Sequence, residues 1–229
     1  MGTPNDDGGY AVCLLPGEYD SLLSGGVANN IQFEEDFLSQ YPTTRACFAF
    51  DGTVSTFPTT RFPIQFVPLN CGAETTETTS NFHEYLQTYQ NAFVKLDIEG
   101  HEFRIIPTWI DTYMSRIKQL VLEIHTPVEI QKSPDACPGL SDIKYEDMFR
   151  LLEGINKTHT LVHLHGNNGC GIHTYGECIV PNVFECTFIR NDFLSEHIPN
   201  KDPIPSPLDV RNHSWYPEIE LRGWPYITS

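Results

Sequence analysis

The sequence predicts an α/β protein built on a doubly wound, mostly parallel sheet that ends in an antiparallel pair of strands. Two observations carry this prediction. Short apolar runs alternate with segments of helical periodicity, which is the pattern of strands separated by crossover helices. The two late apolar runs at 160–165 and 183–190 have no helix between them, so we expect them to pair antiparallel.

Each expected strand is a short apolar run bounded by turn residues or charges. The strands are expected at residues 10–15, 20–23, 45–50, 64–69, 93–98, 119–125, 160–165 and 183–190. Helices are expected where apolar residues recur three and four positions apart. They are expected from about residue 30, at 81–89, from about residue 102 and at 145–155. Asn29 or Asn30 is expected to cap the first helix, and Pro107 to interrupt the third, because proline does not fit a helix interior.

Composition limits the classes of function. Of 229 residues, 40% are hydrophobic and 12% aromatic, which is enough for a folded core. The formal charge of −16 argues against a nucleic-acid partner, because binding a phosphate backbone needs a basic surface. No apolar run approaches the roughly 20 residues of a membrane span, so no membrane partner is expected. Seven cysteines at irregular spacing, without a C-x-x-C pair, favour a reducing, cytoplasmic setting.

One main domain is expected, with an extension. Residues 1–197 contain all the expected strands and helices. Residues 198–229 are rich in proline and lack a periodic pattern, so we expect them to wrap over the same domain as an irregular segment.

Two loops at strand ends have the features of a nucleoside site. Ligands of an open α/β sheet bind at the carboxyl ends of its strands. Ser24-Gly25-Gly26-Val27 follows the first parallel strand and opens a helix, where glycines and free N–H groups let a ligand approach; a tight turn is the alternative. Asp51, followed by Gly52, ends the next strand, where a carboxylate can accept the hydroxyls of a ribose; a cap or turn residue is the alternative. Together the two loops favour a nucleoside cofactor.

The segment Lys95-Leu96-Asp97-Ile98-Glu99-Gly100-His101-Glu102 is the most distinctive in the chain. Strand alternation places Asp97 on one face, and the next strand ends with Glu123 and His125 on a shared face. If the two strands are neighbours, Asp97, Glu123 and His125 converge. Such a cluster can hold a divalent cation such as Mg²⁺ or Mn²⁺, or supply a general base. An ion pair between Glu123 and Lys95 is the structural alternative.

A later strand also ends in polar residues. His165 and Asn167 are expected to face a substrate, with a simple polar turn as the alternative. The histidines and cysteines near residue 170 have no spacing typical of a zinc site. Glu185 lies within an apolar strand and must be paired if it is buried.

Several segments occur in the order of a known family. They are Asp7-Gly8-Gly9-Tyr10, Ser24-Gly25-Gly26-Val27, Gln32-Phe33-Glu34, Phe50-Asp51, Val94-Lys95-Leu96-Asp97-Ile98-Glu99-Gly100-His101-Glu102, Leu122-Glu123-Ile124-His125 and Val183-Phe184-Glu185. In this set and order the chain resembles the FkbM-type family of S-adenosylmethionine-dependent methyltransferases over most of residues 7–190. The segment from Lys95 to Glu102 is the specific part of the resemblance.

The resemblance implies a class I methyltransferase fold, which is Rossmann-like, and S-adenosylmethionine as cofactor. It places Gly25 and Gly26 under the amino-acid portion of the cofactor and Asp51 at its ribose, with Glu34 supporting the pocket. The implied cofactor-binding set is Ser24, Gly25, Gly26, Val27, Glu34, Asp51, Gly52 and Asp97. Two departures stand in the loop, where Ala28 replaces a common glycine and Asn29-Asn30 replaces a frequent acidic residue.

The resemblance also implies an O-methyltransferase that acts on a hydroxyl of a sugar, a glycan or another small molecule. Either Asp97, His125 or His165 takes the hydroxyl proton, or a bound Mg²⁺ or Mn²⁺ at Asp97, Glu123 and His125 lowers the pKa of the hydroxyl. Two other classes stay open. An NAD(P)-dependent oxidoreductase would share the glycine loop and Asp51, although the chain lacks a Tyr-x-x-x-Lys pair. A carbohydrate-binding module without catalysis would suit the aromatic and acidic composition.

Overall fold

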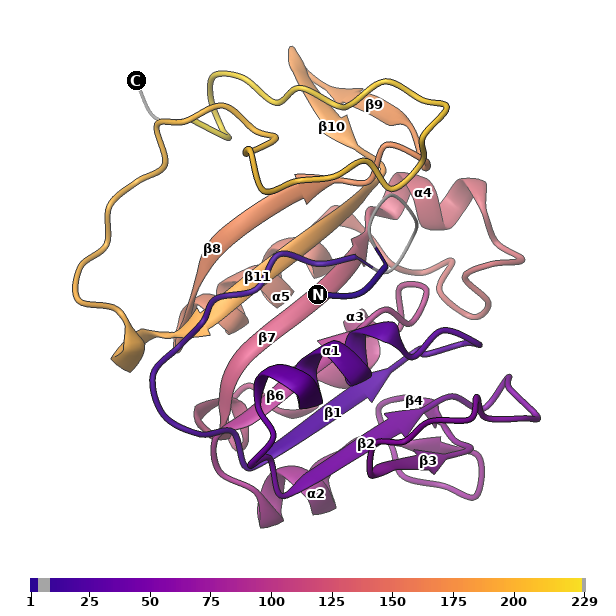
Figure 1. Cartoon of the computed structure of the whole chain (residues 1–229). Helices are drawn as coiled ribbons and strands as arrows, with labels where there is room; N and C mark the ends of the chain where they lie inside the picture. Colours follow the sequence, from indigo (N-terminus) through magenta and orange to yellow (C-terminus); the bar gives the residue numbers. More distant parts are fainter. Residues whose placement is uncertain (4–8, 228–229) are drawn as a thin grey trace.

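The computed structural model describes residues 1–3 and 9–227 (Figure 1). Its centre is a seven-stranded sheet in the order β3-β2-β1-β6-β7-β11-β8. The strands are β1 (Ser21–Gly25), β2 (Ala46–Phe50), β3 (Ile64–Val67), β6 (Ala92–Leu96), β7 (Ile117–His125), β8 (His159–Gly166) and β11 (Val183–Arg190). Neighbouring strands from β3 to β7 pair parallel, whereas β11 is antiparallel to both β7 and β8. This order, with one reversed strand near the edge, is the class I methyltransferase fold, so the predicted fold class is confirmed.

The helices are short and lie on both faces of the sheet. They are α1 (Gln32–Gln40), α2 (His83–Thr88), α3 (Glu102–Ile105), α4 (Pro127–Lys132) and α5 (Tyr145–Asn156), with 3-10 turns at Ile106–Thr108, Met114–Arg116 and Asn191–Phe193. Two small sheets complete the described elements. They pair β4 (Asn70–Cys71) with β5 (Thr79–Ser80), and β9 (Ile172–Tyr175) with β10 (Cys178–Pro181). Figure 1 shows α1 in front of the central sheet and α3 and α5 behind it.

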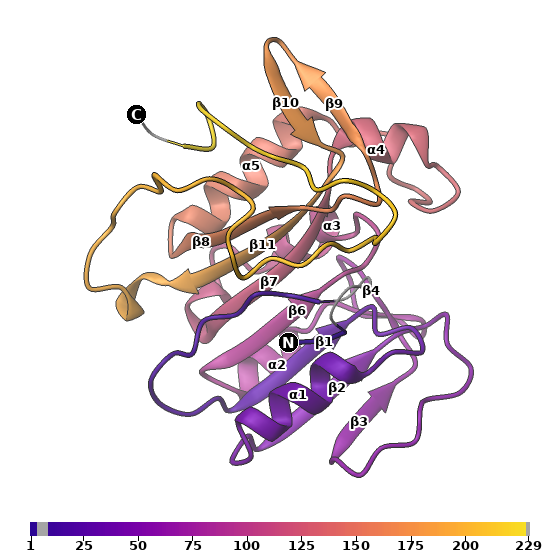
Figure 2. The same cartoon turned by 45° about the horizontal axis from the view of Figure 1, so that its top comes forward.

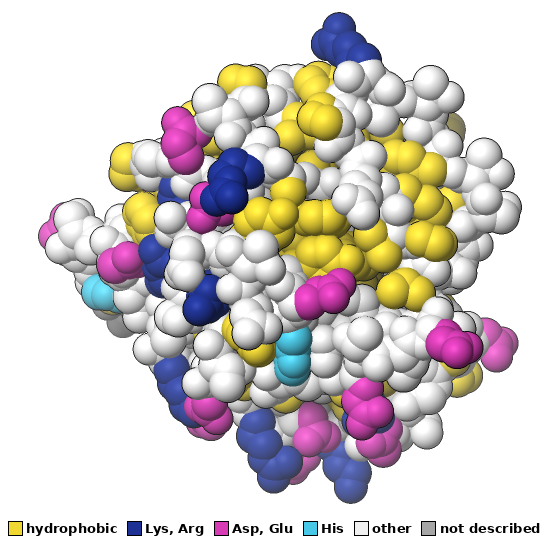
Figure 3. Space-filling model, turned by 90° about the horizontal axis from the view of Figure 1, so that it is seen from below, with side chains coloured by type: hydrophobic (Ala, Val, Ile, Leu, Met, Phe, Trp, Pro, Cys, Tyr) yellow, Lys and Arg dark blue, Asp and Glu magenta, His cyan; other side chains and the backbone are white. Residues whose placement is uncertain are grey.

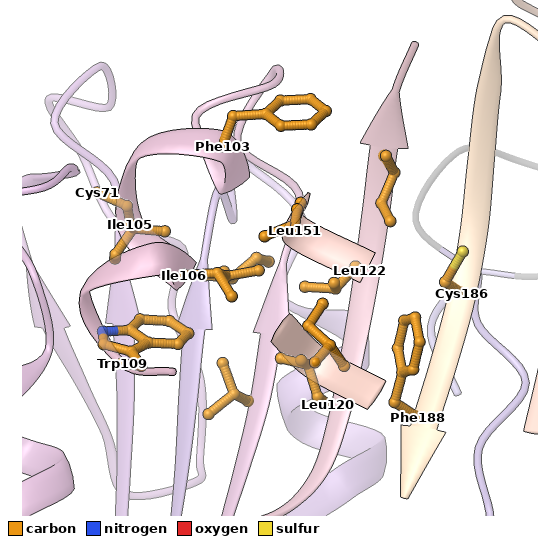
Figure 4. Packing of buried hydrophobic residues seen from close by; sticks show 14 of the residues in the cluster. Cys71, Phe103, Ile105, Ile106, Trp109, Leu120, Leu122, Leu151, Cys186 and Phe188 are labelled. Atoms are coloured by element: carbon orange, nitrogen blue, oxygen red, sulfur yellow. The ribbon is translucent and has the colours of Figure 1, made fainter. Parts of the chain in front are cut away.

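The face of the sheet that α3 and α5 cover, away from α1, is apolar and forms the main core. Side chains of β7 and β11, such as Leu120, Leu122 and Phe188, pack with those of α3 and the 3-10 turn that follows it (Figure 4). Trp109 is fully buried there, and its indole N–H donates to the carbonyl of Asn81 at 2.8 Å. Burial of a side chain of this size contributes a few kcal/mol, roughly 25 cal/mol per Å² of apolar area. This core holds β6 and β7 side by side.

The opposite face of the sheet is apolar where α1 covers it, and toward β7 and β11 it carries polar side chains that the two ends of the chain cover. Gln119 of β7 accepts a hydrogen bond from the N–H of Cys13 at 2.7 Å, and Thr187 of β11 donates to the carbonyl of Ala11 at 2.6 Å. Figures 1 and 2 show the N-terminal segment crossing β7 and β11 on this side. Buried polar groups need hydrogen-bond partners, and the backbone of this segment provides them.

The described part of the C-terminal extension follows an irregular path over β8 and β11 (Figure 2). Ile204 and Leu221 form an isolated bridge within it. The amide of Asn168 donates to the carbonyls of His213 and Tyr216, and His163 pairs with Asp209 at 2.6 Å. These contacts agree with the irregular wrap expected for residues 198–229, while the domain boundary at residue 197 stays a prediction.

The expected strand at residues 10–15 is wrong, because the segment lies across the sheet face and bonds to side chains, not to a strand edge. The first helix begins at Gln32 with Ile31 at the N-cap position. Asn30 lies one residue before the N-cap position, and its side chain accepts the N–H of Gln32, the first helical residue, at 3.1 Å. The expected antiparallel pairing of the last two strands is confirmed, with the β9–β10 hairpin inserted between them.

Three further properties of the described residues bear on function. No helix among them is long and apolar enough to cross a membrane. Figure 3 shows apolar side chains gathered in one area of the face seen from below, with charged side chains around it. All seven cysteines are free thiols.

Candidate functional site

The loops after β1, β2 and β6 meet at the carboxyl ends of these adjacent strands. The N–H of Gly26 donates to the carbonyl of Phe50 at 2.9 Å, and the N–H of Asp97 donates to the carbonyl of Gly25 at 3.2 Å. The ammonium group of Lys95 donates to the carbonyl of Gly26 at 3.0 Å. The three stretches singled out in the sequence therefore form one edge of the sheet.

The glycines of this loop are required by the approach of the chain to itself. Gly26 has φ +73°, and a Cβ atom there would lie 1.7 Å from the carbonyl oxygen of Asp97. A Cβ atom at Gly25 would lie 2.7 Å from the sulfur of Cys71. Val27 is buried in a small cluster with Ile31. The tight-turn interpretation of the loop therefore describes its local packing, and contact with a cofactor stays a prediction.

Asp51 joins the loops after β1 and β2. One carboxylate oxygen accepts the N–H of Ala28 at 2.8 Å, and the other accepts the N–H and hydroxyl of Thr53 at 2.8 and 2.6 Å. Burial raises the pKa of Asp51, but the hydrogen bonds lower it by more, so the pKa falls below its ordinary value. The group is therefore ionised at neutral pH. The N–H of Gly52 donates to the side chain of Asn70 at 3.1 Å. This geometry is the turn-residue alternative, and a contact with ribose stays a prediction.

Glu34 lies beneath the glycine loop. The hydroxyl of Ser24 donates to one of its carboxylate oxygens at 2.5 Å, and both residues are fully buried. Burial raises the pKa of Glu34, which the nearby Lys95 opposes. The second oxygen of Glu34 has no hydrogen-bond partner among the described residues. It is thus an unused acceptor directly below the loop.

Asp97 is held by two donors. Its carboxylate accepts from the hydroxyl of Tyr10 at 2.8 Å and from the ammonium group of Lys95 at 3.3 Å. The Lys95 nitrogen also lies 5.5 Å from the centre of the Tyr10 ring. Burial raises the pKa of Asp97, but Lys95 and the hydrogen bonds lower it more, while the carboxylates keep the pKa of Lys95 raised. Asp97 is therefore an anchored, ionised carboxylate whose side chain keeps 19% exposure to solvent.

The predicted convergence of Asp97, Glu123 and His125 is present, because β6 and β7 are neighbours. The carboxyl groups of Asp97 and Glu123 interact, and an oxygen of Glu123 lies 3.3 Å from Nε2 of His125. Glu99 lies 3.4 Å from the same nitrogen. Burial lowers the pKa of His125, but interactions with the Cys137 thiol and the Glu123 carboxylate, together with the charge of Glu102, raise it to about 11. Without a cation bound beside it, this raised pKa favours the protonated imidazole at neutral pH.

His165 is engaged through both ring nitrogens. Nδ1 lies 3.0 Å from Glu185 and Nε2 lies 3.1 Å from Glu218 of the C-terminal extension. Burial lowers the pKa of His165, but the two carboxylates raise it to about 9. His165 thus has no free nitrogen with which to take a proton, and we assign it no part in a reaction. Glu185 is buried and paired, as expected, and its partner is this histidine. The side chain of Asn167, which was expected to face a substrate, is buried and donates to the carboxylate of Glu123 at 3.0 Å.

Three further residues of the site had no predicted role. Glu99 and Glu102 were noted only as part of a charged segment, and Cys137 lies in a stretch without any motif. Glu102 accepts the N–H of Ile98 at 2.9 Å, and burial raises its pKa to about 7. Ligand atoms of Glu99, His125 and Cys137 all lie within 4.8 Å of one another. Because Glu99, His125 and Cys137 come from three separate segments, no local spacing in the sequence indicates that they meet.

No family model matches this chain. No curated protein matches it either. Similar solved structures include fibrillarin in complex with Nop5p, at 7% identity over 75% of this chain and 72% of that chain, with a TM-score of 0.41. Another is the plantazolicin methyltransferase BpumL with a monoazolic desmethylPZN analog and SAH, at 11% identity over 76% of both chains and a TM-score of 0.42. The plantazolicin methyltransferase BamL with a triazolic analog and SAH has 13% identity over 76% and 78%, with a TM-score of 0.40. Because these similarities are low, the assignment of the fold rests on the strand order of the sheet and not on them.

Substitution Gly26→Ala should destabilise the fold strongly, because its methyl group would collide with the Asp97 carbonyl. Gly139→Ala is a matched control, since Gly139 has φ +74° with nothing within 4 Å of an added Cβ. We expect the control to lose roughly 1 kcal/mol for the left-handed backbone alone, and Gly26→Ala to lose at least about 2 kcal/mol more. Urea unfolding measures both, and equal losses would contradict the close approach.

Substitution Glu218→Gln should lower the pKa of His165, because it removes one of two carboxylates that hold the imidazolium. The folded pKa of about 9 exceeds the ordinary 6.5, so this pairing stabilises the fold fully below pH 6.5 and is lost as pH rises through 9. Titration of the ring by NMR, with unfolding between pH 6 and 10, measures both effects. Glu220→Gln on the same segment is the control, since Glu220 pairs with Arg222. A wild-type His165 that titrates near 6.5 would refute the assignment.

Proposed function

We propose that this chain is an S-adenosylmethionine-dependent methyltransferase that methylates a hydroxyl of a sugar, a glycan or another small molecule. One observation carries the proposal. The sheet has the class I strand order, and Gly26, Asp51 and Asp97 lie together at the carboxyl ends of its adjacent strands β1, β2 and β6. Ligands of open α/β sheets bind at this edge.

The polar groups of this edge suit the cofactor. The second oxygen of Glu34 is a buried acceptor without a partner among the described residues, as a binding site for an ammonium group would contain. The hydroxyl of Thr53 on Asp51 makes the kind of bond that a ribose hydroxyl can replace. The backbone of Gly25 to Ala28 would lie beside the amino-acid portion. When bound, the cofactor supplies an electrophilic methyl group on a sulfonium.

Asp97 is the residue of this chain best placed to act on an acceptor hydroxyl. Tyr10 and Lys95 fix its carboxylate and keep it ionised, so it can accept a hydrogen bond from the hydroxyl and orient the oxygen. Orientation of the reacting oxygen is the main contribution that a protein makes to such a displacement. The hydroxyl proton passes to Asp97 or to water as the new bond forms.

Binding of S-adenosylhomocysteine should raise the melting temperature of this protein, whereas NAD should not. A ligand that binds only the native state at 100 times its Kd adds about 2.7 kcal/mol to the free energy of unfolding. Differential scanning fluorimetry measures the shift for both compounds in parallel. A shift with NAD alone would favour the oxidoreductase class. No shift with either, together with retention on a glycan column, would favour a binding module.

Substitution Asp97→Asn should lower kcat by about 10²- to 10⁴-fold, because the amide cannot take the hydroxyl proton. Transfer of a labelled methyl group to a panel of sugars and glycans measures the rate. Asp111→Asn is the control, since Asp111 is an exposed carboxylate that pairs with Lys157 at the surface. Circular dichroism and the thermal shift with S-adenosylhomocysteine separate loss of chemistry from loss of fold. Unchanged turnover in folded Asp97→Asn protein would remove Asp97 from the mechanism.

A further inference from the structure

Three ligand-type side chains from separate segments meet beside the proposed site. Glu99 lies in the turn after β6, His125 is the last residue of β7, and Cys137 lies between α4 and α5. Their ligand atoms are all within 4.8 Å of one another. Zinc bonds of about 2.0–2.3 Å place tetrahedral ligands roughly 3.3–3.8 Å apart, so modest side-chain movement closes the set on one ion.

The donor atoms of this cluster are a sulfur, an imidazole nitrogen and a carboxylate oxygen. Zinc accepts all three, whereas Mg²⁺ and Ca²⁺ select oxygen ligands. The cluster therefore differs in chemistry from the Asp97, Glu123 and His125 set expected for Mg²⁺ or Mn²⁺. Only His125 belongs to both sets.

The contacts of His125 resemble those of a metal-bound histidine whose ring is fixed by a carboxylate. Its Nε2 lies 3.3 Å from Glu123, whose other oxygen accepts from the amide of Asn167 at 3.0 Å. A ligating histidine commonly binds a carboxylate through its second nitrogen, which fixes the ring. Nδ1 of His125 is buried and makes no hydrogen bond of normal length among the described residues, and the thiol of Cys137 is the group that interacts with the ring beside it. A buried nitrogen of this kind is costly unless something binds it.

The local charge also favours a cation. Glu99, Glu102 and Glu123 surround His125, and Glu102 is fully buried with one oxygen that has no partner among the described residues. One imidazolium balances only one of the two carboxylates, Glu99 and Glu123, that lie within 3.4 Å of its Nε2. A divalent ion at the centre offsets the repulsion among them.

The segment that carries Cys137 is fixed against the turn after β6. A Cβ atom at Gly100 would lie 3.0 Å from Leu140, so the two segments are in close contact. Arg104 donates to the carbonyl of Gly139 at 3.2 Å and to Asp142 at 2.5 Å. Cys137 itself is buried. The thiol is thus held next to His125 by the contacts of the residues that follow it.

We propose that Glu99, His125 and Cys137 form a zinc site. Three protein ligands leave a fourth position, as in catalytic zinc sites, and the Glu99 side chain is 57% exposed, so this position is open to an oxygen ligand from solvent. The proposal does not rest on methyl transfer.

Zinc binding is tested on the full chain after treatment with a chelator and dialysis. Isothermal titration with ZnCl₂ should show one zinc per chain, and elemental analysis should give the same ratio. Cobalt substitution should produce a thiolate-to-metal absorption band in the near ultraviolet. Cys137→Ser should lose the band and weaken zinc binding more than about 100-fold. Glu123→Gln, which changes only the partner of the His125 ring, should weaken it about 10- to 100-fold.

Cys178→Ser is the matched control, since Cys178 is a free thiol outside the cluster, and it should bind zinc like the wild type. The site is refuted if zinc does not bind at one equivalent, or if Cys137→Ser retains the cobalt band and the affinity. Tighter binding of Mg²⁺ or Mn²⁺ than of zinc, unaffected by Cys137→Ser, would also refute it. The titration reports metal alone and the shift with S-adenosylhomocysteine reports the cofactor, so either proposal can fail without the other.

Discussion

Charged groups on one face of the central sheet have to be paired, and this requirement shapes the rest of the molecule. Lys95 is nearly fully buried and is balanced by Asp97, the Tyr10 ring and the carbonyl of Gly26. Across the sheet His165 is balanced by Glu185 and Glu218. A buried charge without a partner costs several kcal/mol, so the chain ends that supply Tyr10 and Glu218 are integral to the fold.

The same requirement connects the candidate site with the termini. Asp97 would be solvated at the sheet edge of a protein without the N-terminal segment, but here Tyr10 covers it and fixes its direction. Lys95 binds both Asp97 and the backbone of Gly26, so one side chain aligns the turn after β6 with the loop after β1. The geometry at the edge therefore depends on contacts that are far apart in the sequence.

The fold was largely predictable because its signals are local. The apolar strands at Ala92–Leu96 and Ile117–His125 stand out from their flanks, and their parallel pairing follows from the helical segments between them. The expected strand at residues 10–15 has the same apolar pattern, but pattern alone does not reveal that Gln119 and Thr187 bind its backbone from the sheet face. The convergence of Asp97, Glu123 and His125 was predictable from strand ends. Cys137 was not, because contacts of Gly100 and Arg104 place it there, and these are tertiary.

The turn at Glu99 explains how one short segment serves two sites. Glu99 is a non-glycine residue with φ +55°, and Gly100 follows with φ +86°. Two consecutive residues in the left-handed region reverse the chain after Asp97. Asp97 therefore faces Tyr10 and Lys95, while Glu99 faces His125. A regular strand would place residues two apart on the same face, so the left-handed turn is what separates the carboxylate of the methyl-transfer proposal from that of the zinc proposal.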